Sequence, residues 1–178
     1  MLVAMVIAAI AIPKVVTIVQ NLRTAGDAQN LNSAILLAKM SAASNAAHAR
    51  LHADFGTNSF WVEVAPTGVV PTSTTTWTTQ GGTQYLAKNV SFGYGSISSA
   101  PSNTQSTFGQ ASTCSGATST ACIEFNSRGI PVDSSNSPTG NDALYVTDGN
   151  TVTGVTVAGT GLTKAWRTPA STAIWTQR

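Results

Sequence analysis

The first twelve residues, "MLVAMVIAAIAI", contain no polar side chain, and Pro13 and Lys14 follow them directly. So apolar a segment is unstable in water and must be covered by lipid or by protein. As a helix it would reach roughly 18 Å, short of the roughly 30 Å hydrocarbon core of a bilayer. The segment is therefore predicted to be part of a longer membrane helix or a helix buried against other protein.

A cleaved secretory signal peptide is the alternative interpretation of this opening. Such a peptide has a basic region before the apolar run and a small-residue cleavage site after it. Here Met1 leads directly into the run, and a second apolar stretch, "VVTIV", follows Lys14. The sequence therefore favours an apolar helix that stays in the protein.

The chain is poor in charge for its length. Charged residues make up 9% of its 178 residues, and the formal net charge is +2, whereas about 25% charged residues is usual. This balance indicates no general attraction to nucleic acid or to an anionic membrane. Ser, Thr and Gly concentrate beyond residue 66, which predicts an uncharged polar surface of a kind common outside the cell.

The two cysteines, Cys114 and Cys122, lie in the Ser/Thr/Gly-rich stretch "TCSGATSTACIEF". An even number of cysteines in a chain of extracytoplasmic character favours a disulfide. Closing so short a loop would stabilise the fold by roughly 2–3 kcal/mol. Two free buried thiols are the alternative, and zinc is not expected because no second Cys or His pair lies nearby in the sequence.

Residues 1 to about 50 are predicted to form one long helix, which only Pro13 and Gly26 interrupt. Residues 1–25 are apolar on all sides and are expected to protrude. Residues 26–53 are expected to be amphipathic and to pack one apolar stripe on the rest of the protein. The stripe recurs at helical spacing and consists of Leu31, Ile35, Ala38 and Ala42.

Residues 54–178 are predicted to form a β-rich globular head that contains a Ser/Thr-rich region, 66–121. Three segments alternate like strands around turn residues and predict hairpins: "ARLHADFGTNSFWVEV", "CIEFNSRGIPV" and "ALYVTDGNTVTGVTVAG". The last turns at Asp148-Gly149, a pair suited to a type I′ turn. The predicted fold class is α+β, with a long N-terminal helix packed on an antiparallel sheet.

These features resemble the type IV pilin superfamily. The resemblance lies in the apolar opening that ends "AIAIP", the Ala-rich helix with "AILLAKMSAASNAA" and the hairpin after it. More narrowly, "IEFNSRGIPV", "ALYVTDG" and "VTVAGTGLTKAWR" resemble the C-terminal sheet of the H-type pseudopilins of type II secretion and the T-type pseudopilins of type IV pili. The resemblance covers about residues 1–65 and 122–167, and it implies a pilin-like fold.

The start of the chain departs from the family pattern. Family members begin with a short basic leader and a Gly before the cleavage point, followed by a Phe and a glutamate. Pro13 matches the family proline, which places that start upstream of Met1. The sequence is therefore expected to begin at an internal methionine, without the glutamate that pairs with a neighbouring subunit.

The resemblance implies a structural subunit that waits in the inner membrane and assembles with copies of itself into an extracellular helical filament at the bacterial cell surface. The pilus or secretion assembly machinery would be its other partner, and no enzymatic activity or cofactor is expected. Pro13 and Gly26 would loosen the rod. The filament core would be made by Leu2, Val3, Val6, Ile7, Ile10 and Ile12.

Three other functions are open. The chain could be a minor pseudopilin of a type II secretion system, or its opening could simply anchor a lone membrane-tethered domain. It could also be a DNA-binding pseudopilin for DNA uptake, because the T-type relatives hold DNA with their closing basic segment. Here that segment offers Lys164 and Arg167 for phosphates and Trp166 for stacking on a base, although the family's Gly-Arg-x-Arg is not reproduced.

Two kinds of metal site are conceivable and neither is expected. His48 and His52 have the i, i+4 spacing of a helical zinc site with Asp54 nearby, but the end of the helix is predicted between them and would send the rings apart. Asp133, Asp142 and Asp148 lie in loops, and three such oxygens are fewer than calcium requires. Glu63 and Glu124 belong to separate hairpins, so no pair of catalytic carboxylates is predicted.

Overall fold

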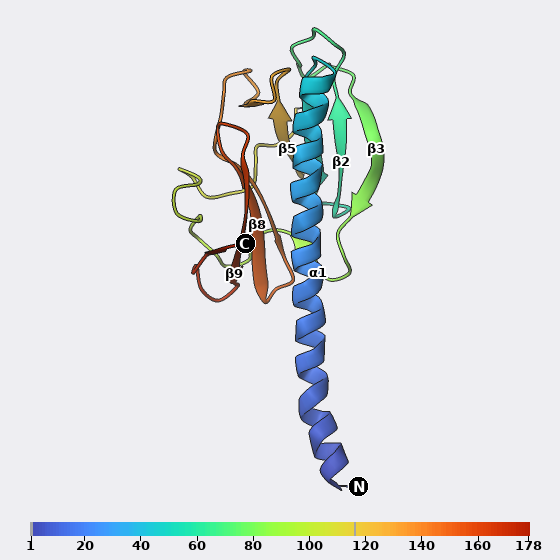
Figure 1. Cartoon of the computed structure of the whole chain (residues 1–178), viewed down its shortest axis with the longest axis vertical. Coiled ribbons are helices and arrows are strands. Elements are labelled where there is room, and N and C mark those ends of the chain that lie inside the picture. The colour runs from blue at the N-terminus through green and yellow to red at the C-terminus, as the bar shows by residue number, and fades with distance from the viewer. Residues whose placement is uncertain (1, 116) are drawn as a thin grey trace.

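The computed structural model describes residues 2–115 and 117–178; of residues 2–17 it describes the helical backbone and not the side chains. The helix α1 (Leu2–Ser44) lies along a β-rich head. Its first half extends beyond the head (Figure 1). The helix is continuous through Pro13 and Gly26, and the packing does not require glycine at position 26, because a Cβ there would meet no atom within 4 Å.

The second half of α1 packs on the head through the predicted stripe, and Leu31, Ile35, Ala38 and Ala42 are all fully buried. The prediction of a helix to about residue 50 was wrong, because α1 ends at Ser44 and residues 49–54 form a strand. Ala46 adopts a left-handed φ of 49°, and the N–H groups of Ala46 and Ala47 donate to the carbonyls of Ala43 and Ala42. This is a Schellman ending, which usually has a glycine in the place of Ala46.

In the described part of the chain, ten strands form two five-stranded antiparallel sheets, whereas one sheet was predicted from the sequence. Sheet A has the order β3-β2-β1-β5-β6 and sheet B the order β10-β9-β8-β7-β4. The strands of sheet A are β1 (Ala49–Asp54), β2 (Ser59–Val64), β3 (Thr78–Tyr85), β5 (Thr120–Phe125) and β6 (Pro131–Val132). Those of sheet B are β4 (Ser91–Phe92), β7 (Asp142–Thr147), β8 (Thr151–Val157), β9 (Thr163–Pro169) and β10 (Thr176–Gln177). The edge strands β4 and β6 span two residues each.

The predicted hairpins are present as β1–β2, β5–β6 and β7–β8. The third does not have a type I′ turn. Thr147 pairs with Val152 across a four-residue loop, and φ is positive at Gly149 but not at Asp148. Asp148 instead uses its carboxylate to accept hydrogen bonds from the N–H groups of Asn150 and Thr151. The loop is therefore an Asx turn at Asp148 and not a type I′ turn.

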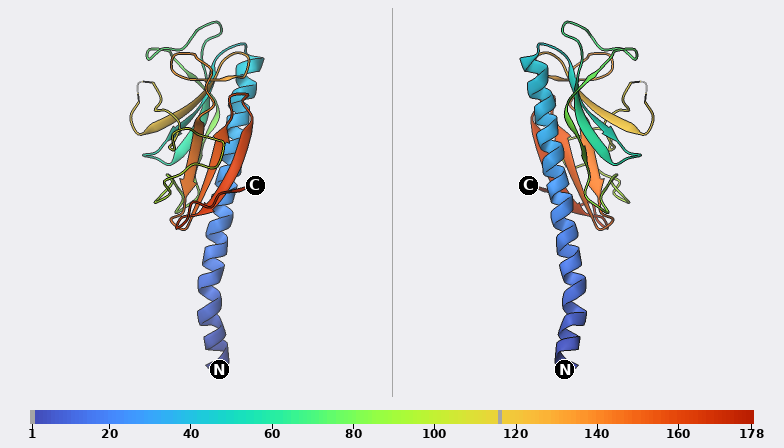
Figure 2. Two further views of the ribbon diagram at one scale, coloured as in Figure 1. Left: turned by 90° about the vertical axis from the view of Figure 1, so that its left-hand side faces the viewer. Right: turned by 90° about the vertical axis from the view of Figure 1, so that its right-hand side faces the viewer.

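The main core lies between α1 and the facing sides of both sheets, which is why one helix face is covered and the other is bare (Figure 2). Leu31 and Ile35 of the helix pack there with Leu51 of sheet A and Leu144 of sheet B. A second, smaller cluster lies on the far side of sheet B around Tyr145. The Ser/Thr-rich region supplies β3 and β4 and the loops that cover these clusters.

Candidate functional site

The bare side of α1 carries two apolar groups of residues. Ile18, Val19 and Leu22 form the first, and Leu36, Leu37 and Met40 form the second, about five helical turns further on. Leu22 and Met40 are 67% and 68% exposed. We call these six residues the outer face. It lies opposite the buried stripe, so the helix is apolar on two sides and not amphipathic in the one-sided sense predicted for residues 26–53.

No charge interrupts this face between Thr24 and Ser44. The two charged residues of that stretch, Asp27 and Lys39, both turn toward the head. Asp27 accepts a hydrogen bond from the Ala87 N–H at 2.9 Å, and Lys39 Nζ donates to the Gly161 carbonyl at 3.0 Å. The outer face between its two apolar groups therefore presents uncharged polar side chains, among them Gln29 and Ser33, which are exposed.

The proposed filament-core residues Leu2, Val3, Val6, Ile7, Ile10 and Ile12, together with Pro13, have side chains that lie outside the described part of the structure. Among the residues whose side chains are described, no helix has the length and apolarity needed to cross a membrane.

A row of charged side chains crosses the side of sheet A that faces away from α1. β1 lies between β2 and β5, and Arg50 is paired in register with Glu63 on one side and with Glu124 on the other. Arg50 Nε donates to Glu63 Oε2 at 2.7 Å, and its guanidinium lies 4.0 Å from the centre of the Trp77 ring. His48 Nδ1 is hydrogen-bonded to Glu124 Oε1 at 2.8 Å.

Burial affects the two glutamates of this row in different ways. It would raise the pKa of Glu63, but His52, the Trp61 indole N–H and the Arg50 guanidinium outweigh it and lower the pKa to about 2. Burial raises the pKa of Glu124 in spite of His48 and Arg50 nearby. Glu63 is therefore the ionised partner of Arg50 over the whole physiological range of pH.

This row was not predicted from the sequence, because Glu63 and Glu124 were expected in separate hairpins. The alternation of β1 puts His48, Arg50, His52 and Asp54 on one side of the strand, and the neighbours of β1 in the sheet were not predicted. The helix was expected to end between His48 and His52, but it ends before both, at Ser44. The two rings have separate glutamate neighbours, Glu124 and Glu63, and no zinc site of His48, His52 and Asp54 is formed in the described part of the chain.

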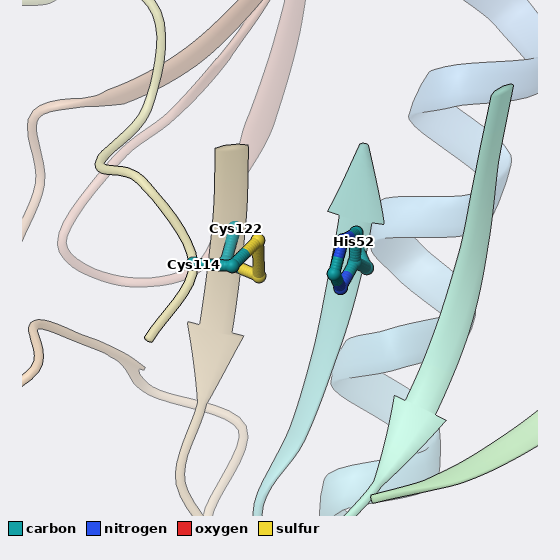
Figure 3. Close-up of side chains that lie close together, drawn as sticks. All are labelled: His52, Cys114 and Cys122. Atoms are coloured by element: carbon teal, nitrogen blue, oxygen red, sulfur yellow. A yellow bond between two sulfur atoms is a disulfide. The ribbon is translucent and has the colours of Figure 1, made fainter. Parts of the chain in front are cut away.

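The disulfide between Cys114 and Cys122 is present. It joins the loop before β5 to the strand itself, at the position of β5 that is paired with His52 of β1. The His52 imidazole consequently lies beside the two sulfur atoms (Figure 3). Local sequence could not reveal this neighbour, because His52 and Cys114 are 62 positions apart in the chain.

The three aspartates considered for calcium do not come together. Asp142 and Asp148 lie at opposite ends of β7, and Asp148 is bonded to Thr24 of the helix through Thr24 Oγ1 at 3.2 Å. Asp133 and Asp142 both line a cavity of about 80 Å³ beneath Trp77. Asp133 Oδ1 accepts the N–H groups of Ser135 and Ser137, as in an ordinary Asx turn.

We expect Asp142→Asn to stabilise the fold at neutral pH. Burial, and secondarily the charge of Asp133, raise the pKa of Asp142 from 3.8 to about 6. A pKa raised on folding means that the ionised carboxyl destabilises the fold, a cost absent below pH 3.8 and complete above pH 6. One pKa unit corresponds to about 1.4 kcal/mol, so the variant should gain roughly 2–3 kcal/mol in free energy of unfolding at pH 7.

Urea denaturation of the full chain in a non-ionic detergent at pH 7 and at pH 3.5 checks this prediction. The gain should almost vanish at pH 3.5, where the carboxyl is mostly protonated in both states. Asp133→Asn should give a smaller gain at pH 7, because it removes only the neighbouring charge. An equal gain from Asp142→Asn at both pH values would contradict the argument.

The residues considered for DNA contact do not share one face of β9. Lys164 and Trp166 point to one side of the strand, and Arg167 points to the other. The indole N–H of Trp166 donates to Thr156 Oγ1 at 2.9 Å, so the ring is fixed against the sheet. The arrangement separates the two cations that the DNA hypothesis needs on one surface.

Comparison of the chain with family models, with curated proteins and with solved structures finds no match.

Proposed function

We propose that the chain is a structural subunit of an extracellular helical filament of the type IV pilus or related pseudopilus kind, in which α1 packs against the α1 helices of other copies. The observation that carries this proposal is the outer face of α1, whose two apolar groups are exposed on the same side of the helix. The resemblance of the apolar opening to the pilins supports the same conclusion.

The second apolar group distinguishes a filament from a lone membrane-tethered domain. Leu36, Leu37 and Met40 lie at the level of the head, roughly 27 Å along the helix from Ile18. A bilayer that received the apolar opening would leave these three side chains in water. Fully covering one such side chain contributes about 1.5–3 kcal/mol, and helices of further copies would cover both groups at once because both lie on one side of the same helix.

Substitution of an outer-face residue by a charge should block assembly without unfolding the head. We expect Met40→Glu to raise the protein concentration at which assemblies sediment roughly tenfold, the effect of a loss of about 1.4 kcal/mol in association free energy. Assembly would be followed by sedimentation and electron microscopy after detergent is removed from the purified full chain. A photo-crosslinking residue at position 36 should join one copy of the chain to another.

Tyr85→Glu is the matched control, because Tyr85 is 70% exposed on β3 and Met40 is 68% exposed. Both substitutions replace an exposed apolar side chain by the same charge, and only the first lies on the outer face. Equal assembly of the two variants would refute the proposal. So would a wild-type chain that stays monomeric after detergent removal, with no crosslink from position 36.

A further inference from the structure

Cys114, Cys122 and His52 form a compact group of possible metal ligands (Figure 3). Their two sulfur atoms and an imidazole nitrogen all lie within 4.8 Å of one another. In a tetrahedral site with Zn–S bonds of about 2.3 Å and Zn–N bonds of about 2.0 Å, neighbouring ligand atoms are roughly 3.5–3.8 Å apart. The three side chains are therefore already close to the spacing that one zinc ion would impose.

The structure holds His52 in place without giving its Nδ1 a partner. The ring is stacked on Trp61 with 4.3 Å between centres and 16° between planes, and the residue is 9% exposed. Its Nδ1 is buried without a hydrogen bond, since Glu63 Oε2 at 3.5 Å is too distant for a good one. A carboxylate beside one imidazole nitrogen is the usual neighbour of a histidine that binds a metal through its other nitrogen.

The two cysteines differ in how freely they can move. Cys122 is on β5, where it is paired in register with His52 of β1. Cys114 is in the loop before β5, which the Cys122 N–H anchors through Ser112 O at 2.9 Å. Opening the disulfide would thus leave one fixed sulfur and one that can adjust by the small distance a metal site requires.

We propose that this group is a redox-switched metal site, in which the reduced chain binds one Zn²⁺ through Cys114 Sγ, Cys122 Sγ and an imidazole nitrogen of His52, with water as the fourth ligand. A dithiol reductant supplies two electrons and two protons, breaks the S–S bond to give two thiols and closes its own disulfide. Zn²⁺ then displaces the two thiol protons. Because both states use the same sulfurs, oxidation to the disulfide releases the metal. The proposal is independent of filament assembly.

The test compares the full chain in its oxidised and reduced forms, both in a non-ionic detergent. A phosphine reduces the disulfide, and it takes up an oxygen atom from water as the two thiols form. Zn²⁺ is titrated against a chromogenic chelator, and Co²⁺ is added separately for its thiolate charge-transfer absorption. We expect one equivalent of tightly bound metal in the reduced chain and none in the oxidised chain. Absence of stoichiometric binding by the reduced wild type overturns the proposal.

His52→Ala and His48→Ala form a matched pair, since both histidines point to the same side of sheet A and only His52 is beside the cysteines. We expect His52→Ala to weaken zinc affinity at least tenfold and to alter the Co²⁺ spectrum, and His48→Ala to change affinity less than twofold. His52→Asn serves as a second substitution, with circular dichroism to show that each variant is folded. Equal zinc affinity for wild type and a folded His52 variant would mean that a bare dithiol binds the metal, and would overturn the site.

Discussion

Gly154→Ala should lower the free energy of unfolding by roughly 3 kcal/mol, at the upper end of the range for overpacked cores. A Cβ on Gly154 would overlap the ring atoms Cδ1 and Cε1 of Tyr145, its cross-strand neighbour. The Tyr145 ring has no room to move away. It is fully buried, and its hydroxyl donates to Gln105 Oε1 at 2.6 Å.

Other aromatic rings close the space around Tyr145 on several sides. Its ring centre lies 5.1 Å from that of Phe108 and 5.6 Å from that of Trp175. The φ of Gly154 is not positive, so the expected loss is steric and does not come from backbone strain. Without the clash, alanine in a strand would be slightly favourable relative to glycine.

Gly82→Ala is the control for this prediction. Gly82 is also in a strand, β3, and also lacks a positive φ, but a Cβ added to it would meet no atom within 4 Å. The substitution should be neutral or stabilising by a few tenths of a kcal/mol in chemical denaturation of the full chain. In a Tyr145→Leu background the penalty of Gly154→Ala should shrink, because the smaller side chain leaves room. If Gly154→Ala lost as much stability in the Tyr145→Leu background, the clash with the Tyr145 ring would not be the cause.

The elements that local sequence predicts are those whose signal is contained in a few consecutive residues. The buried stripe of α1 follows from the spacing of Leu31, Ile35 and Ala38, and each hairpin from alternation around a turn. The end of α1 was missed because Ala46 adopts the left-handed conformation that a glycine normally marks. The outer face was not predicted, because only the buried side of the helical pattern was considered and Leu36 and Leu37 lie on the other side.

The candidate sites depend on strand order, which local patterns do not contain. β1 pairs with β2 as its hairpin partner, but its other neighbour is β5, about 70 residues later in the chain. That single pairing brings Glu124 beside Arg50 and Cys122 beside His52. The disulfide was predictable from cysteine count and composition, and the imidazole next to it was not.

Arg50→Met should be as damaging as Gly154→Ala, because it leaves the buried Glu63 carboxylate without its cation. Removing one partner of a buried ion pair costs about 3–5 kcal/mol, and Arg50 also loses its contact with the Trp77 ring. We therefore expect the free energy of unfolding at pH 7 to fall by roughly 3 kcal/mol in urea denaturation. Arg128→Met, at an exposed position, should change it by less than about 0.5 kcal/mol.

The pH dependence separates loss of the ion pair from loss of packing. In the wild type the pKa of Glu63 is lowered from 4.5 to about 2, so the stability that its ionised form contributes is present above pH 4.5 and is lost as the pH falls toward 2. Without Arg50 that contribution is removed and burial favours the protonated carboxyl. The difference between wild type and Arg50→Met should therefore be largest at pH 7 and should shrink below pH 4. Adding Glu63→Gln to Arg50→Met should restore part of the lost stability at pH 7, because the amide needs no cation. A double variant that is no more stable than Arg50→Met would contradict this explanation.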